Sequence, residues 1–131
     1  MKKMLLFAPA ALLTALLFTA CTKEKNRVFN ANFYTSEPNT QMFLYIDDVY
    51  QGQLAFFQNK PECGGSAGDG PKLLGMQLNS GEYKVTGKNA QGTVLSTAVI
   101  RLRANSLGST GNVGGIRMED NGSCLTVDLT K

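Results

Sequence analysis

The sequence predicts an all-β protein, a small antiparallel β-sandwich of about eight short strands that follows an N-terminal signal peptide. Beyond residue 26, apolar and polar residues alternate in short runs rich in aromatic and β-branched side chains, which is typical of half-buried strands. Glycine, asparagine and aspartate separate these runs at regular intervals, as turns do in all-β domains. No run has a convincing helical period, so we expect a single β domain over residues 27–131.

The first 20 residues have the composition of an export signal. Lys2 and Lys3 precede an almost unbroken apolar run over residues 4–18, and two small residues follow it. A basic start, a short apolar segment and small residues before a cleavage site define signals of this kind. The run is shorter than the roughly 20 apolar residues that a transmembrane helix needs, so we expect residues 1–20 to be removed.

The end of this signal resembles the lipobox of bacterial lipoproteins. It reads Phe18-Thr19-Ala20-Cys21, in which the last three residues fit the motif and Phe18 stands where leucine is usual. The resemblance implies that Cys21 carries a diacylglycerol and an acylated amino group, and two or three acyl chains hold a protein stably on a membrane. It also implies a place in the bacterial cell envelope, at the outer membrane and facing the periplasm or the cell surface. The alternative is an ordinary secretory signal with an incidental cysteine. If the lipobox is processed, residues 21–26 are the lipidated cysteine and a polar tether.

The first half of the domain predicts one strand and then a hairpin. Residues 27–34 alternate as a strand does, and residues 41–46 and 49–57 form two further strands around Asp47-Asp48. Aspartate favours a turn at this point because it tolerates left-handed backbone geometry.

Residues 59–71 interrupt the strand pattern with four glycines and two prolines. This composition predicts a long surface loop. A loop of such length within a compact domain is usually either functional or disordered.

The second half predicts five more strands, joined by three turns and by a longer loop over residues 104–111. The turns are expected at residues 79–81, 89–92 and 119–122, where glycine accompanies asparagine or aspartate. The five strands are expected at residues 72–78, 82–88, 93–103, 112–118 and 123–129.

Two segments resemble the signatures of PEGA-type modules. Residues 43–52 read FLYIDDVYQG, similar to the family's apolar-Tyr-apolar-Asp-Gly hairpin with Asp48 in place of the glycine. Residues 78–85 read LNSGEYKV, similar to its Leu-x-x-Gly-x-aromatic-x-Val signature. The resemblance implies an immunoglobulin- or transthyretin-like sandwich of the kind found on bacterial surface proteins. It implies no particular ligand, since a fold does not fix a function.

Cys63 and Cys124 are the two cysteines that remain when Cys21 carries lipid. In an oxidising compartment such a pair is expected to form a disulfide. The alternatives are two free thiols or a metal site, although structural zinc needs four ligands and the sequence holds no histidine.

The composition argues against several classes of function. The chain carries 13 basic and 10 acidic residues, and two of the basic ones lie in the signal, so the mature protein is close to neutral. Such a balance gives no electrostatic basis for binding nucleic acid. The lack of histidine removes the commonest general base and the commonest metal ligand. We therefore expect no enzyme activity, no cofactor and no metal.

Four residues are candidate ligand contacts. Tyr45 and Tyr50 belong to an aromatic-rich hairpin whose second face could meet a partner. Arg101 and Arg103 lie two residues apart on one strand face and could clamp a carboxylate or an acidic glycan. The alternatives are aromatic packing within the fold and a solvated strand face.

Together these features predict a lipid-anchored, non-catalytic envelope or cell-surface protein that acts as a binding or structural module. Its expected partners are membrane lipid, through Cys21, and an envelope protein or glycan. The alternative is an inhibitor of a hydrolase such as lysozyme, in which the loop over residues 59–71 blocks the enzyme.

Overall fold

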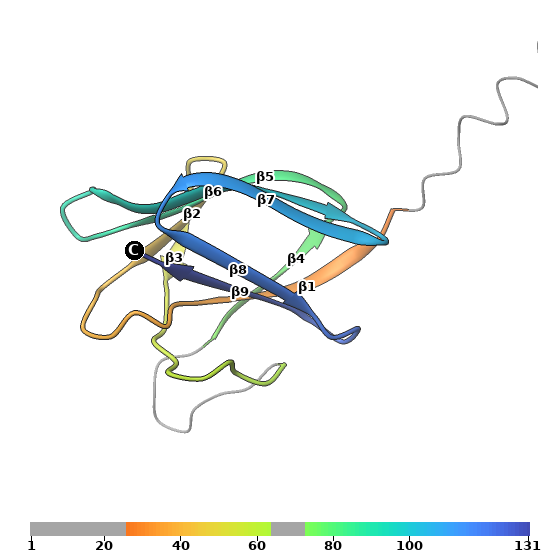
Figure 1. Cartoon of the computed structure of the whole chain (residues 1–131), viewed down its shortest axis with the longest axis horizontal. Coiled ribbons are helices and arrows are strands. Elements are labelled where there is room, and N and C mark those ends of the chain that lie inside the picture. The colour runs from red at the N-terminus through yellow and green to blue at the C-terminus, as the bar shows by residue number, and fades with distance from the viewer. Residues whose placement is uncertain (1–25, 64–72) are drawn as a thin grey trace, which may run out of the picture.

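The structure is a computed structural model that describes residues 26–63 and 73–131. The predicted signal, Cys21, the rest of the tether to residue 25 and most of the predicted loop lie outside these residues. The described residues form nine strands and contain no helix (Figure 1). The strands are β1 Val28–Tyr34, β2 Phe43–Ile46, β3 Val49–Gln53, β4 Leu74–Asn79, β5 Gly81–Lys88, β6 Val94–Arg103, β7 Ser106–Val113, β8 Gly115–Asp120 and β9 Leu125–Thr130.

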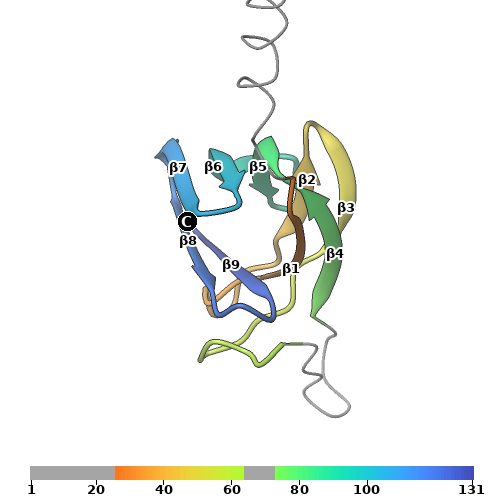
Figure 2. The same ribbon diagram turned by 90° about the vertical axis from the view of Figure 1, so that its right-hand side faces the viewer.

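The strands form two facing sheets, as the sequence predicts. One sheet has four strands in the order β4-β1-β9-β8, and the other has five in the order β3-β2-β5-β6-β7. Figure 2 shows the two sheets lying one above the other. Neighbouring strands are antiparallel except for β1 and β9, which run parallel in the middle of the four-stranded sheet. The protein is therefore a small β-sandwich in which the first and last strands are neighbours.

The core lies between the sheets and comes from alternate residues of the strands. Successive side chains of a strand point to opposite faces, so every second residue of β1 and β9 enters the core. Apolar side chains from β2, β5 and β6 meet them from the other sheet. The most deeply buried of these residues are Phe29, Ala31, Phe33, Leu44, Val85, Ile100, Leu102, Leu125, Val127 and Leu129.

The β2–β3 hairpin confirms the predicted turn and shortens the strand after it. Asp47 and Asp48 have φ angles of 50° and 65°, the left-handed geometry that a two-residue hairpin turn requires. The predicted strand over residues 49–57 ends at Gln53, because Leu54 turns into the core and its N–H donates to the carbonyl oxygen of Met42 at 2.8 Å.

The prediction of a loop over residues 104–111 and a strand over residues 112–118 is wrong. The chain turns at Ala104-Asn105 and continues as β7, the edge strand of the five-stranded sheet. Gly114, with φ of 65°, then carries it across to the other sheet, where β8 begins. Most of β7 is exposed and polar, so its sequence lacks the apolar alternation by which strands are recognised.

After β3 the chain covers the outer face of the four-stranded sheet. Residues 54–63 pass beneath this sheet in Figure 1, and the N–H of Phe57 donates to the Thr35 carbonyl at 2.9 Å. The Tyr34 and Phe57 rings meet edge to face, with centroids 6.0 Å apart. This covering segment explains why β9 is buried on both of its faces.

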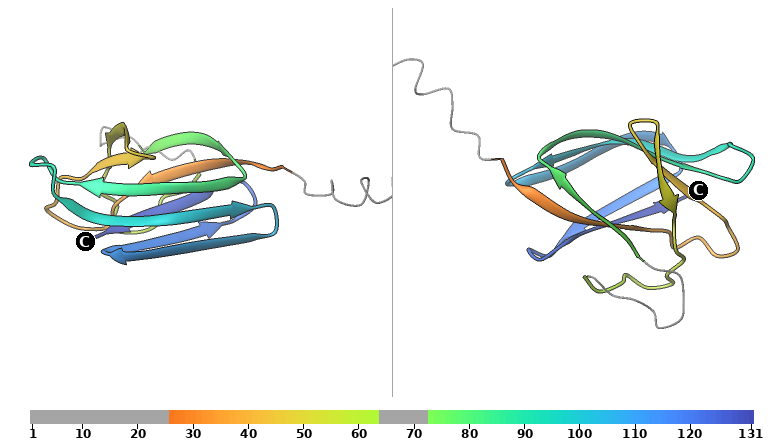
Figure 3. Two further views of the ribbon diagram at one scale, coloured as in Figure 1. Left: turned by 90° about the horizontal axis from the view of Figure 1, so that it is seen from above. Right: turned by 180° about the vertical axis from the view of Figure 1, so that it is seen from behind.

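The described chain enters the sandwich at one end, and Lys131 lies at the opposite end (Figure 3). β1 and β9 run in the same direction between these ends. Their last residues therefore lie far from the point where the chain enters the fold.

Candidate functional site

Cys63 and Cys124 form a disulfide, which confirms the predicted pairing. Their Cα atoms are 5.8 Å apart, and 61 residues separate them in the sequence. Cys63 ends the described part of the covering segment, and Cys124 directly precedes β9. Asn121 supports the bridge, since its side-chain N–H donates to Cys63 Sγ at 3.2 Å and its Oδ1 accepts from the Cys124 N–H at 2.9 Å. The disulfide thus holds residues 54–63 against the outer face of the four-stranded sheet.

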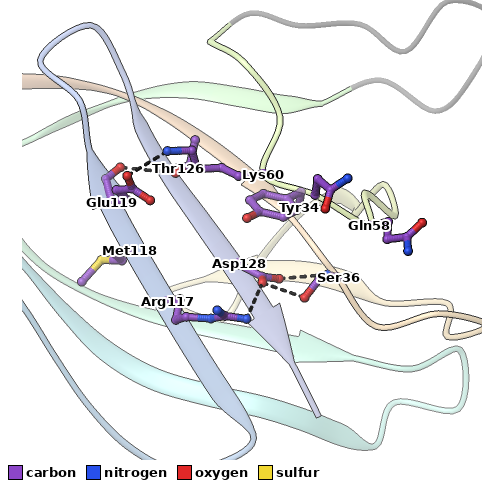
Figure 4. A pocket seen from close by; sticks show the side chains of 10 residues that line it. Tyr34, Ser36, Gln58, Lys60, Arg117, Met118, Glu119, Thr126 and Asp128 are labelled. Atoms are coloured by element: carbon purple, nitrogen blue, oxygen red, sulfur yellow. Dashed lines mark hydrogen bonds and ion pairs between the residues drawn. The ribbon is translucent and has the colours of Figure 1, made fainter.

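A hollow of about 500 Å³ lies between this covering segment and strands β8 and β9 (Figure 4). We call it the outer-face hollow. It is lined by Tyr34, Ser36, residues 58–60, residues 117–119, Thr126 and Asp128. Its volume falls within the range of about 300–1,000 Å³ that is common for ligand sites.

Asp128 is a buried carboxylate at the floor of the hollow, with 5% of its side chain exposed. β9 places it there, because Val127 and Leu129 on either side point into the core. Asp128 Oδ1 accepts the N–H of Ser36 at 2.9 Å, and Oδ2 accepts the Ser36 hydroxyl at 2.7 Å. These bonds satisfy the carboxylate and fix the chain just beyond β1.

Two ion pairs lie in the lining of the hollow, both drawn in Figure 4. Arg117 extends from β8 to within 3.6 Å of Asp128 Oδ2, and 84% of the arginine side chain remains exposed. Lys60 on the covering segment meets Glu119 on β8 at 2.8 Å. Each cation is therefore matched by one carboxylate.

Tyr34 adds a phenol to the same site. Burial raises the pKa of Tyr34 above its ordinary value of 10.0, and the negative charge of Asp128 acts in the same direction. The hydroxyl stays protonated at neutral pH and is available as a hydrogen-bond donor.

Tyr45 and Tyr50 lie together on the outer face of the other sheet, away from the hollow. Their ring centroids are 5.6 Å apart, and Phe43 contacts Tyr50 at 6.2 Å. Lys88 Nζ lies 4.3 Å from the centroid of Tyr45. Much of this hairpin's aromatic surface is thus packed against itself, although 56% of Tyr50 is exposed.

Arg101 and Arg103 lie near the end at which the chain enters the sandwich. They line a smaller hollow of about 200 Å³ together with Asn26 and Glu82, and Arg101 pairs with Glu82 at 3.0 Å. Tyr45 of β2 lies opposite Thr86 of β5, and Thr86 lies opposite Thr97 of β6. Thr97 precedes Arg101 by four residues, which is about 13 Å along the strand. The tyrosine pair and the arginine pair therefore lie at two separate positions on the outer face of the five-stranded sheet.

The sequence pattern does not single out the residues of the outer-face hollow. The one available signal is the alternation of Thr126 and Asp128 with apolar residues in β9, which predicts a polar outer face there. The hollow itself depends on the covering segment, whose position no local pattern encodes.

Within residues 26–63 and 73–131, no group of three or more aspartate, glutamate, cysteine or histidine side chains is placed to hold a metal ion. In the same residues, no helix is long and apolar enough to cross a membrane. Comparisons of the chain with protein families, with curated proteins and with solved structures found no match.

Proposed function

We propose that this protein is a lipid-anchored, non-catalytic binding module of the bacterial envelope, and that the outer-face hollow is its ligand site. The signal that ends at Cys21 supports the anchor, since its basic start, apolar run and lipobox-like end are the features of lipoprotein signals. The PEGA-like segments agree with a surface module of this type. The fold supplies a rigid platform for the site.

The observation that carries the proposal is the placement of the hollow relative to the start of the domain. β1 begins at Val28, directly after the tether, and ends at Tyr34 in the wall of the hollow. Seven residues of strand span about 20 Å. A chain held at Cys21 would keep the start of β1 beside the membrane and leave the hollow accessible from the aqueous side.

Two measurements test the proposal together. Cys21→Ser should move the protein from the detergent phase to the aqueous phase, or leave the precursor uncut. Capture from envelope extract should recover a ligand with the wild type and with Lys84→Gln, which lies outside the hollow, and lose it with Arg117→Gln. Normal processing and detergent-phase partitioning of Cys21→Ser would exclude the anchor. Equal capture by Arg117→Gln and Lys84→Gln would exclude the hollow as the ligand site.

A second candidate function is inhibition of an envelope-directed hydrolase such as lysozyme. The disulfide favours it, because it fixes Cys63, within the predicted inhibitory loop, to the body of the sandwich. A segment that is fixed at one point before binding loses less entropy when it enters an active site. Slower lysis of a bacterial cell-wall suspension by lysozyme, with recovery after reduction of the disulfide, would support this function. An unchanged lysis rate at excess protein would exclude it for lysozyme.

A further inference from the structure

The charges of the outer-face hollow indicate what kind of ligand it can accept. Arg117 faces Asp128 at 3.6 Å, and Lys60 faces Glu119 at 2.8 Å. Among the described residues, the charged side chains of the lining therefore sum to zero. An anionic ligand would have to compete with a carboxylate already in place, and a cationic ligand with an arginine or a lysine. The hollow is thus suited to a neutral ligand.

The hydrogen-bonding groups narrow the choice further. A guanidinium has five N–H donors. Arg117 approaches Asp128 with one terminal nitrogen at 3.6 Å, so its other N–H groups can donate to a ligand. Gln58 and Asn59 add two exposed side-chain amides at the opposite wall, each with both donors and an acceptor. Tyr34 contributes a protonated phenol. The lining of the hollow therefore offers both hydrogen-bond donors and hydrogen-bond acceptors.

The surface of the hollow is more polar than apolar. The Phe57 and Tyr34 rings pack against each other edge to face. The exposed side chains of β8 that line the hollow are those of Arg117 and Glu119, which are charged. An acyl chain or an aromatic ligand would desolvate several polar groups there without replacing their hydrogen bonds. The occupant must instead carry many hydroxyl or amide groups of its own.

We infer that the outer-face hollow binds a short neutral oligosaccharide. Each sugar hydroxyl can donate and accept, so neighbouring hydroxyls can receive a hydrogen bond from Arg117 and return one to Glu119 or to an amide at Gln58 or Asn59. Binding of this kind leaves both ion pairs in place. The inference deepens the proposed function, since it names the ligand class of the same site.

The test is a binding measurement with the processed lipoprotein, purified in mild detergent with its disulfide intact. The probes are immobilised neutral oligosaccharides of hexoses and N-acetylhexosamines, beside otherwise matched oligosaccharides that carry uronate or sulfate. Free neutral oligosaccharide serves as the competitor. The wild type should bind at least one neutral probe, and the free sugar should displace it.

Two substitutions in the hollow and one outside it locate the binding. Arg117→Gln should weaken binding at least about tenfold, because it removes charged hydrogen bonds to the sugar. Gln58→Ala should weaken it less. Lys84→Gln removes a cation that is likewise exposed and paired with a carboxylate, but on the other sheet, and should change binding by less than about twofold. Thermal unfolding of each variant checks that the fold is retained.

Three outcomes would overturn the inference. They are binding to no neutral probe, binding only to the uronate or sulfate probes, and equal loss of binding in Arg117→Gln and Lys84→Gln. A failure of the sugar-binding inference can be distinguished from a failure of the lipid anchor, because the phase partitioning of Cys21→Ser is measured without any sugar. A protein that binds an envelope protein at the hollow but no sugar would keep the proposed function and lose only this ligand class.

Discussion

The disulfide between Cys63 and Cys124 joins the end of the covering segment, residues 54–63, to the start of β9, which Cys124 directly precedes. Pro61, two residues before Cys63, is buried, whereas Gln58, Asn59 and Lys60 are exposed at the wall of the hollow. The bridge therefore closes one side of the outer-face hollow as well as a long loop. Its loss should affect both stability and binding.

Replacing Cys63 with serine should lower the free energy of unfolding by about 2–5 kcal/mol, the usual range for a small secreted domain. Cys63 is the better choice than Cys124 because it is exposed, so serine adds no buried polar group. Urea denaturation of the variant and of the reduced wild type should give similar midpoints. Two reactive thiols per chain in the unreduced, unfolded wild type would show that the bridge does not form in solution.

Replacing Gly114 with alanine should destabilise the protein by about 2–5 kcal/mol. Its φ of 65° is unfavourable for alanine, and a Cβ atom there would collide with the carbonyl oxygens of Thr130 and Leu95. Gly108→Ala is the matched control in β7, because a Cβ atom at that position meets nothing within 4 Å. Thermal unfolding of the two variants measures the difference. Equal melting temperatures would mean that the chain does not cross between the sheets at Gly114.

Replacing Ser36 with alanine should cost about 1.5–3 kcal/mol. The change removes the hydroxyl that donates to Asp128 at 2.7 Å and leaves a buried carboxylate oxygen without that partner. Ser109→Ala, at an exposed position in β7, should stay within about 0.5 kcal/mol of the wild type. Chemical denaturation provides the comparison, and a neutral Ser36→Ala would show that water replaces the lost bond.

Asp120 should contribute to stability above acidic pH. The backbone N–H of Gly122 donates to its carboxylate at 3.0 Å and Arg27 pairs with it at 2.9 Å, and both lower the pKa of Asp120 below its ordinary value of 3.8. Because the folded state holds the charged form more tightly, this contribution is complete above pH 3.8. It disappears as the pH falls through the lower pKa of the folded state.

Asp120→Asn isolates this effect. The wild type should lose more stability than the variant between about pH 5 and pH 2 in urea titrations. Asp48→Asn is the control, since Asp48 is an exposed carboxylate paired only with Lys84 among the described residues. An identical pH dependence of wild type and Asp120→Asn would contradict the assignment.

Local chemistry was sufficient to predict much of the fold. The alternation in β1 and β9 identifies the core residues, and Asp47-Asp48 identifies a hairpin turn because both residues accept positive φ. The cysteine pairing follows from the number of cysteines and the expected compartment. Each of these signals is contained in a few neighbouring residues or in a simple count.

The remaining features depend on contacts between distant parts of the chain. β7 is an exposed edge strand that consists mostly of serine, glycine, threonine and asparagine. Its sequence therefore shows no alternation of apolar and polar residues. The parallel pairing of β1 with β9 joins the two ends of the domain. The outer-face hollow requires the covering segment to fold back over Asp128, and that placement is set by the disulfide and by bonds to Thr35.

The most direct test of the account is the intact mass of the protein purified from bacterial membranes. We predict a mature chain that begins at Cys21, with a mass higher than that of residues 21–131 by a diacylglycerol and an amide-linked acyl chain. Mild base should release the ester-linked acyl chains and lower the mass accordingly. A mature chain with no lipid mass, or one that begins at another residue, would contradict the account.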